Sequence, residues 1–296
     1  MQITRFGHSC LLVETGRASI LIDPGEYSDG WTDLDGLDAV LITHRHPDHV
    51  DPARFPQFIA ERPGLPVHAE KGVLEDLPAV GGAVLSAGTR ITVEDVTVTA
   101  VGGEHAVIHP EIPRIGNVGL IIAGPGEPVL FHPGDEIDTA PEGVDVLAVP
   151  MMAPWSKIGE TVDFVRSVGA RFVIPIHDGL LNDRGFALLA DRVAAMGGSE
   201  FVPLGAGNPV PYFEKLHAAG VKVIPVVPSV KLAKRVEDKG ADAIVVEGME
   251  AGGHIGVLST LPLMEQVIPE VKLPVVMAGG FGDGRALAAA LLMGAS

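Results

Sequence analysis

The sequence predicts a two-module α/β protein, with a layered α/β sandwich over residues 1–204 and three βα units over residues 205–296. Three observations predict this organisation. In the first module, short apolar strands separated by Gly- and Pro-rich turns precede most of the helices. In the second module, strands and helices alternate regularly. The composition also changes abruptly where the two modules meet.

The change of composition falls at Leu204. The chain of 296 residues has a formal net charge of −17, of which residues 1–204 carry −16 (13 basic and 29 acidic side chains) and the rest −1 (8 and 9). Arginine dominates before Leu204 (11 Arg, 2 Lys) and lysine after it (2 Arg, 6 Lys). A single domain offers no physical reason for such a change. We therefore expect two modules of different origin, joined in the turn-rich segment 203–209.

Composition and charge exclude several classes of protein. An acidic chain is repelled by nucleic-acid phosphates, and no apolar run approaches the ~20 residues that a membrane helix needs. The first residues lack the layout of a signal peptide. Cys10 is the one cysteine, which rules out an internal disulfide and fits a reducing compartment. We expect a cytoplasmic enzyme acting on a small molecule, with no nucleic-acid or membrane partner.

Strands in the first module are predicted from continuous apolar runs and from alternation of Val with Thr or Ala. The predicted strands cover residues 2–6, 9–14, 18–22, 39–43, 96–101, 118–122, 129–132, 144–149 and 172–176, and segment 66–69 is strand-like. The predicted helices cover residues 52–61, 159–168 and 185–196. Asp51 can cap the first of these helices, and Pro52 suits its first position. Strands with helices outside them predict a layered sandwich.

Side chains that can bind metals are concentrated where one buried strand ends. The apolar run 39–43 leads directly into His44-Arg45-His46-Pro47-Asp48-His49. Side chains two positions apart in extended backbone point the same way, so His44 and His46 can bind one ion together. Asp48 and His49 follow where the chain turns and can face a second ion. The pattern H-x-H-x-D-H arises by chance in roughly one such chain in a thousand, which disfavours a surface loop that merely carries polar residues.

Together with segments before and after it, this motif resembles the metallo-β-lactamase fold hydrolases over about residues 1–204. The other segments that carry the resemblance are Phe6-Gly7-His8-Ser9-Cys10, Ile22-Asp23-Pro24, Gly103-Glu104-His105-Ala106, His132-Pro133-Gly134-Asp135 and Ile174-Pro175-Ile176-His177-Asp178. The resemblance implies an αββα sandwich with a two-metal site at one edge of its sheets. Within the family, the sequence is most similar to small hydrolases near the ascorbate-phosphate lactonase-like branch, rather than to antibiotic-degrading members.

The resemblance also implies a set of metal ligands and a reaction. The implied ligands are His44, His46 and His105 for the first ion, Asp48, His49 and His177 for the second, and Asp135 for both. Imidazole and carboxylate ligands suit Zn²⁺, with Mn²⁺, Fe²⁺ and Ni²⁺ as alternatives. Two such ions would lower the pKa of a water towards ~7, giving hydroxide for attack on a lactone, ester, amide or phosphoester. Asp48 is the candidate catalytic residue, because it could orient the nucleophile or carry a proton.

The sequence leaves alternatives open for the neighbouring polar residues. His109 competes with His105 for the third-histidine role, and His105 is favoured because it follows strand 96–101 more closely. Asp23 and His132 are candidates to orient ligands. For His132, a strand histidine that faces inward and has a backbone partner is an equal alternative.

Four further side chains are given no ligand role from the sequence. His8 is expected to be structural or at the rim of the pocket, and His68 is expected not to bind metal. Trp155 is expected to wall the pocket or, equally, to pack in the core. Cys10 is expected to be a small buried apolar residue rather than a nucleophile.

The second module alternates strands over residues 221–227, 241–247 and 273–278 with helices over residues 230–239, 261–267 and 285–293. This order predicts parallel strands with right-handed crossovers. Glycine-rich loops follow the last two strands, at residues 250–256 and 278–284. Loops of this kind, leading into helix N-termini, are a common phosphate site in TIM-type barrels.

These segments resemble the flavin-dependent nitronate monooxygenase and type II enoyl-acyl-carrier-protein reductase family, whose fold is a TIM-type barrel that holds FMN. The resemblance places His254 near the flavin and substrate, and Gly279 and Gly280 near the FMN phosphate. Three βα units make only a partial TIM barrel, because a closed barrel needs eight. We therefore expect no FMN and no competent flavin enzyme in this chain alone. Open strand edges favour association of two copies of the chain.

Taken together, the sequence predicts a metal-dependent hydrolase of the metallo-β-lactamase superfamily, acting through the first module. FMN-dependent oxidoreduction by the second module is the alternative, and an inert or oligomerising appendage is a third interpretation of that module. From the two resemblances and the change of composition, we expect the chain to be a chimera or a truncated fusion. Sequencing the source locus across Gly205 and beyond Ser296 tests that hypothesis, which a continuous full barrel there would contradict.

Overall fold

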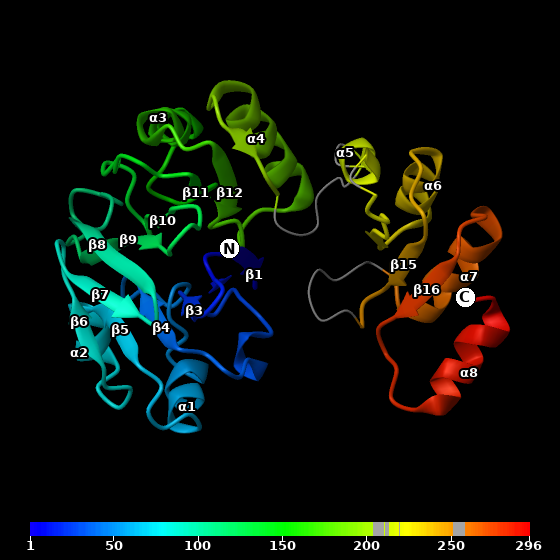
Figure 1. Cartoon of the computed structure of the whole chain (residues 1–296), viewed down its shortest axis with the longest axis horizontal. Coiled ribbons are helices and arrows are strands. Elements are labelled where there is room, and N and C mark those ends of the chain that lie inside the picture. The colour runs from blue at the N-terminus through cyan, green and yellow to red at the C-terminus, as the bar shows by residue number, and fades with distance from the viewer. Residues whose placement is uncertain (204–209, 211–212, 219, 251–257) are drawn as a thin grey trace. The chain divides into compact units, whose positions relative to one another are not determined.

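The computed structural model describes residues 1–203, 210, 213–218, 220–250 and 258–296. The chain divides into two compact units, Met1–Gly205 and Ala206–Ser296. We call them the sandwich unit and the C-terminal unit and describe each by itself (Figure 1).

The first sheet of the sandwich unit has six strands in chain order, an antiparallel meander over β1 to β3 followed by parallel neighbours. Its strands are β1 (Gln2–Arg5), β2 (Leu11–Glu14), β3 (Ser19–Ile22), β4 (Ala39–Ile42), β5 (Val67–Glu70) and β6 (Ala83–Leu85). The turn between β1 and β2 and the chain after β4 both carry residues of the metal motifs.

The second sheet has seven strands in the order β13-β12-β11-β10-β9-β8-β7, antiparallel from β7 to β10 and parallel from β10 to β13. Its strands are β7 (Arg90–Val93), β8 (Val96–Glu104), β9 (Gly116–Ala123), β10 (Leu130–His132), β11 (Val146–Pro150), β12 (Phe172–Ile176) and β13 (Glu200–Phe201). One apolar core, with residues from both sheets, lies between the two sheets.

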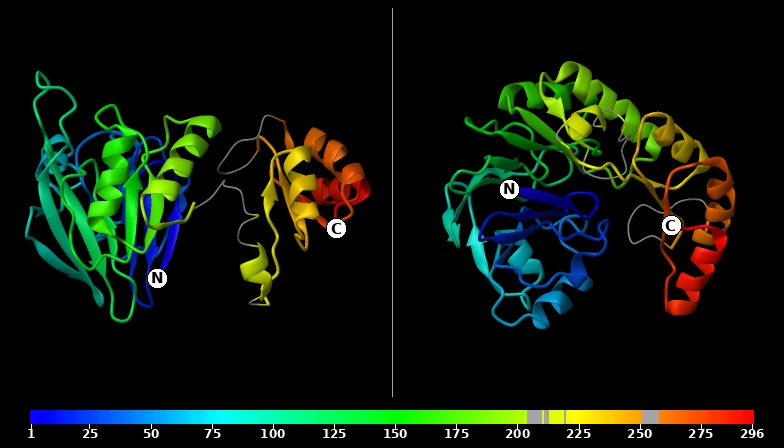
Figure 2. Two further views of the ribbon diagram at one scale, coloured as in Figure 1. Left: turned by 90° about the horizontal axis from the view of Figure 1, so that it is seen from above. Right: turned by 45° about the vertical axis from the view of Figure 1, so that its right-hand side comes forward.

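Helices cover the outer face of each sheet, which gives four layers in the order αββα (Figure 2, right). On the first sheet lie α1 (Arg54–Ala60) and α2 (Lys71–Asp76), with the short 3₁₀ helix η1 (Trp31–Asp33). On the second sheet lie α3 (Ile158–Val168) and α4 (Asp183–Met196). The predicted layered sandwich is therefore the observed architecture.

Strand β4 shows why its sequence is apolar at every position. Its side chains alternate between two cores: Ala39 and Leu41 face the second sheet, whereas Val40 and Ile42 face the helices. All four are fully buried. Burying a Leu or Ile side chain contributes roughly 1.5–3 kcal/mol, so this strand is firmly held at the point where the metal motif begins.

Several elements differ from their predicted bounds. Helix α1 begins at Arg54 rather than Pro52. Asp51 Oδ1 still accepts hydrogen bonds from the backbone N–H groups of Ala53 and Arg54, just before and at this start. Strand β8 continues to Glu104 instead of ending at residue 101. The sequence did not predict α2, β6, β7 or β13, which are short elements.

The C-terminal unit contains a parallel sheet of three strands, β14 (Val226–Val227), β15 (Ile244–Glu247) and β16 (Val275–Ala278). Its described helices are α5 (Phe213–Ala218), α6 (Val230–Asp238), α7 (Thr260–Val267), the short η3 (Ile268–Glu270) and α8 (Gly284–Met293). One face of the sheet packs on the core of the unit, whereas Val226 and Val276 on the other face are 53% and 42% exposed. The predicted strand 221–227 is a strand only over its last two residues.

Within the parts of the chain described above, no helix combines the length and the apolar character needed to cross a membrane.

Candidate metal centre

Eight histidine and aspartate side chains come together where strands of both sheets end. His44, His46, Asp48 and His49 follow β4, whereas the others follow β8, β10 and β12 or lie in the β1–β2 turn. They form two groups, within each of which the ligand atoms all lie within 4.8 Å of one another. The first group is His44, His46, His105 and Asp135, and the second is His8, Asp48, His49 and His177. The structure thus brings together all seven ligands implied by the sequence and adds His8.

The first group is built around the strand end of β4. The Nε2 atom of His44 lies 3.1 Å from the Nδ1 atom of His46. This proximity is the outcome expected for side chains two positions apart at a strand end. His105 is buried and its Nε2 atom lies 3.2 Å from Asp135 Oδ2, whereas His109 is exposed on the following loop. Between these two candidates for the third histidine, the geometry favours His105.

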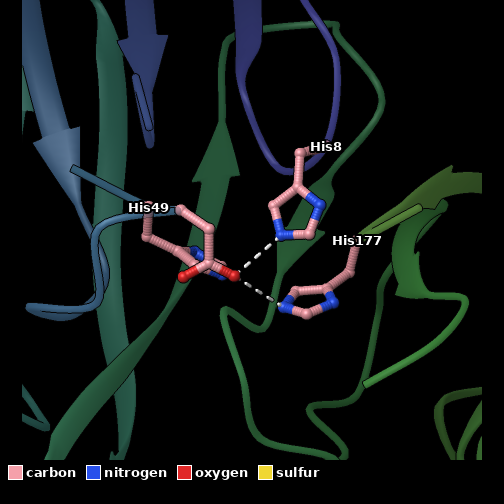
Figure 3. A group of neighbouring side chains, drawn as sticks. His8, His49 and His177 are labelled. Atoms are coloured by element: carbon pink, nitrogen blue, oxygen red, sulfur yellow. Dashed lines mark hydrogen bonds and ion pairs between the residues drawn. The ribbon is translucent and has the colours of Figure 1, made fainter. Parts of the chain in front are cut away.

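The second group surrounds one carboxylate (Figure 3). His8 and His177 point toward the same carboxylate in Figure 3. Their Nε2 atoms lie 3.0 and 3.5 Å from Asp48 Oδ2. The Asp48 side chain is 20% exposed, whereas that of His8 is almost fully buried. Asp48 is therefore the carboxylate of the centre that solvent or a substrate can reach most easily.

Asp135 lies between the two groups. Its Oδ1 atom is 3.0 Å from His49 Nε2, and its Oδ2 atom is 3.2 Å from the Nε2 atoms of both His105 and His177. The indole N–H of Trp155 also donates a hydrogen bond to Oδ2, at 3.0 Å. One buried carboxylate thus faces histidines of both groups, as a bridging ligand would.

Hydrogen bonds made by Nδ1 orient four of the histidine rings. In each ring, Nδ1 donates to an oxygen: Asp23 for His49, Ala106 for His105, Met152 for His177 and Thr43 for His44. The Thr43 hydroxyl can accept because its own hydrogen is donated to Asp23 Oδ2, at 2.7 Å. With Nδ1 engaged, Nε2 is the nitrogen available to a cation in all four rings.

Burial and opposite charges set the protonation of the centre. Burial, the largest influence on each, disfavours charge. The carboxylates of Asp135 and Asp23 nevertheless raise the pKa of His49 well above its usual value. Asp135, together with the nearby carboxylate of Asp48, likewise raises the pKa of His177 to about 9. Those histidines in turn hold the pKa of Asp135 well below its usual range, against its burial. Protons on His49 and His177 thus balance the buried carboxylates when no cation does.

The donor set fits divalent cations. Asp135 Oδ1 and His177 Nε2 are buried, and the described groups that lie 3.0–3.5 Å from them are not aligned to form a hydrogen bond. Buried polar atoms of this kind call for a partner such as an ion or a water. Imidazole nitrogens and carboxylate oxygens together suit Zn²⁺ and related transition metals.

The backbone at the centre adopts an uncommon conformation. Among the residues that the structure describes, four non-glycine residues have positive φ, and three of them belong to or contact the two groups: His8 (47°), Asp23 (46°) and His177 (56°). Such conformations cost on the order of 1–3 kcal/mol each and concentrate at functional sites. Gly25 is also required, because a Cβ atom there would lie 1.8 Å from the backbone oxygen of Asp48.

Four other side chains singled out in the sequence lie outside the two groups. His132 donates from Nε2 to Ser9 O and accepts from Gly134 N at Nδ1, so both of its nitrogens have backbone partners. Asp23 contacts the ligand set through His49. Cys10 is buried, and its burial raises the pKa of its thiol. His68 belongs to neither group.

The FMN residues suggested by the sequence lie in the C-terminal unit. Gly279 and Gly280 have positive φ, and a Cβ atom on either would touch Glu250. At the start of α8, Asp283 Oδ1 accepts a hydrogen bond from the backbone N–H of Arg285. His254 lies outside the described residues. The assignment of these residues to FMN therefore stays a prediction of the sequence.

Comparison with known proteins decides the family. Residues 2–177 match a family model described as beta-lactamase superfamily domain. Protein Rv0786c of Mycobacterium tuberculosis is 41% identical over 202 residues, which are 68% of this chain and 95% of that protein. The chain belongs to the β-lactamase superfamily. The prediction of a metallo-β-lactamase superfamily enzyme is confirmed for the sandwich unit.

Solved structures show the same fold. The metallo-beta-lactamase fold protein YhfI of Bacillus subtilis aligns with a TM-score of 0.54 at 18% identity, covering 68% of this chain and 90% of that one. Igni18, a metallo hydrolase of Ignicoccus hospitalis, aligns with a TM-score of 0.52 at 19% identity, covering 68% and 93%. The predicted αββα metallo-β-lactamase sandwich is confirmed by these alignments.

The C-terminal unit matches another family. Residues 184–296 match the family model for nitronate monooxygenase. The nitronate monooxygenase of Pseudomonas aeruginosa is 43% identical over 90 residues, which are 27% of this chain and 26% of that protein. This chain thus spans about a quarter of the length of that relative. The predicted joining of two families in one chain is confirmed.

Proposed function

We propose that the sandwich unit is a metal-dependent hydrolase with a dinuclear site. The proposed ligands are those of the two groups without His8: His44, His46 and His105 for one cation, Asp48, His49 and His177 for the other, and Asp135 for both. The observation that carries the proposal is the position of Asp135, whose two oxygens lie 3.0–3.2 Å from imidazole nitrogens of both groups. We propose Zn²⁺ as the metal, with Mn²⁺, Fe²⁺ and Ni²⁺ as the alternatives to be tested.

A pair of divalent cations at such a site supplies Lewis acidity and a low water pKa at neutral pH. The residues of the chain provide orientation. Acceptors on Nδ1 fix four histidine rings, and the Trp155 N–H holds Asp135. Asp48 is the proposed catalytic residue, because its carboxylate is accessible and its pKa is lowered, against its burial, by the neighbouring His177 and by the hydrogen bond from His8. An ionised carboxylate at this place can orient an attacking water and accept its proton.

The proposed substrate is a small molecule with a lactone, ester, amide or phosphoester bond. A panel of lactones, phosphodiesters and thioesters, assayed with Zn²⁺-loaded protein, tests the reaction class. His46→Ala should abolish hydrolysis together with metal binding at the first group. His109→Ala removes an exposed histidine of the loop after β8 and is the matched control, which should retain both. Hydrolysis that survives in His46→Ala would contradict the proposal.

The C-terminal unit supports a second candidate function only through its family match. FMN-dependent oxidoreduction is the activity that such a match suggests, and flavin absorbance after incubation with FMN tests it. We propose instead that this unit is an appendage that associates two copies of the chain through its open sheet. We also propose a reducing, cytoplasmic location. This rests on Cys10, which is buried and forms no disulfide.

A further inference from the structure

His8 uses its ring nitrogens differently from the other histidines of the centre. Its Nδ1 atom accepts a hydrogen bond from the backbone N–H of Gly179, at 3.0 Å. Because a backbone amide nitrogen can only donate, Nδ1 carries a lone pair and the hydrogen of the neutral ring is on Nε2. Nε2 lies 3.0 Å from Asp48 Oδ2, so it donates to that carboxylate.

This arrangement is the reverse of the one in the proposed ligands. In His49 and His177, the other histidines of the second group, Nδ1 is the donor and Nε2 faces the ligand atoms. His8 presents a hydrogen where those rings present a lone pair. An imidazole nitrogen that carries a hydrogen cannot bind a cation. His8 is therefore set apart from the ligands, although its Nε2 atom lies within the same group.

The surroundings of His8 hold its ring in this orientation. The ring lies with its centroid 4.1 Å from that of His177 and 5.3 Å from that of Tyr27. The backbone oxygen of His8 accepts from His177 N, at 3.1 Å. A Cβ atom on Gly179 would lie 2.9 Å from His8 Nδ1, so only glycine brings its amide this close without displacing the ring.

We propose that His8 is a positioning residue, which binds no metal and fixes the carboxylate of Asp48 by donating a hydrogen bond from Nε2. The Asp48 carboxylate needs such a partner because it is partly exposed to solvent. Asp48 is 20% exposed and lies on a turn, so an unrestrained carboxylate could rotate toward water. A charge-assisted hydrogen bond from a buried ring prevents this rotation. The proposal rests on the proposed function, because it assigns His8 a part in binding the second cation.

Zn²⁺ titration against a chromophoric chelator tests the proposal on the full chain. His8→Ala should weaken the second Zn²⁺ about 10- to 100-fold, as loss of an orienting partner typically does, and leave the first within about 2-fold. His8→Gln places an amide N–H near the position of Nε2 and should restore most of the affinity. His8→Gln that is as weak as His8→Ala would overturn the proposal, because it would indicate a ligand. Two variants that both bind like the wild type would overturn it as well.

A second measurement covers the case in which His8→Ala does not fold. Long-range ¹H–¹⁵N NMR of the wild-type chain reports which ring nitrogen carries hydrogen. We expect Nε2–H for His8 both without metal and with Zn²⁺, and Nδ1–H with Zn²⁺ for the four proposed ligand rings that donate from Nδ1. Nδ1–H at His8 would overturn the proposal. If the wild type binds no Zn²⁺, the proposed function fails by itself, and the metal-free spectrum still decides the hydrogen position on His8.

Discussion

Proton release on metal binding is the prediction that the electrostatics of the centre specify most closely. Without metal, the neighbouring carboxylates raise the pKa of His177 to about 9, so it is mostly protonated at pH 7. His49, with a pKa raised well above its usual value, is protonated too. Asp48 and Asp135 are already ionised, because their pKa values are lowered. Each of the two histidines must lose its proton to bind a cation.

Binding of two Zn²⁺ ions should therefore release at least about two protons per chain. Calorimetric titration of the metal-free protein in buffers of different ionisation enthalpy counts them. Measurement near pH 6 keeps a water with a pKa of ~7 mostly protonated, so it adds little to the count. His109→Ala should give the same count as the wild type. Release of less than one proton would refute the assignment of His49 and His177 as protonated ligands.

The sign of the pH dependence follows from the same pKa values. Between pH 6 and 7, the product of the two Zn²⁺ association constants should rise by about 100-fold per pH unit, since two protons leave. An affinity that is independent of pH between 6 and 8 would contradict the account.

Three further predictions concern stability and spectroscopy. The raised pKa of His177 stabilises the metal-free fold, and this contribution is complete below pH ~6.5. About 3 kcal/mol of unfolding free energy should be lost as the pH rises through about 9, as measured by urea denaturation. An unfolding free energy that stays constant over that range would contradict the prediction. Co²⁺ binding should quench the fluorescence of Trp155, which donates a hydrogen bond to Asp135. In Trp155→Phe the quenching should disappear, while the buried Trp31 still emits. Quenching that persists in Trp155→Phe would contradict the prediction. Asp51→Ala should destabilise the sandwich unit by about 1 kcal/mol, because the backbone N–H groups of Ala53 and Arg54 lose the carboxylate that accepts from them. Unchanged denaturation midpoints would disprove this role.

Much of the sandwich was predictable because strands such as β4 are buried on both faces and are therefore apolar at every position. In β4, neighbouring residues fill two different cores, so the strand reads as an unbroken apolar run. The short strand β6 escaped prediction because Ala83 and Val84 are exposed and carry no pattern. In the C-terminal unit the segment 221–227 is apolar except for Lys222, yet Val221 and Ile224 are exposed and only its end pairs with β15.

The centre was predictable where residue type and strand end coincide. The H-x-H-x-D-H motif places four side chains by local geometry, and the structure brings His105, Asp135 and His177 to them from the second sheet. The place of His8 was not predictable, because it depends on a left-handed turn and on the Gly179 amide, 171 residues along the chain. Its position between Gly7 and Ser9 in the first turn was the one sequence signal, since such turns allow uncommon conformations. The Trp155 hydrogen bond to Asp135 likewise required the folded chain.

The location of metal in crystals of the Zn²⁺-loaded protein tests the central claim most directly. Anomalous scattering at the zinc edge should show two sites ~3.5–4 Å apart, with Asp135 touching both. One site should lie ~2.0–2.1 Å from Nε2 of His44 and His105, and the other at that distance from Nε2 of His49 and His177, with His8 beyond bonding distance of either. A single site, or zinc bound away from Asp135, would contradict the account.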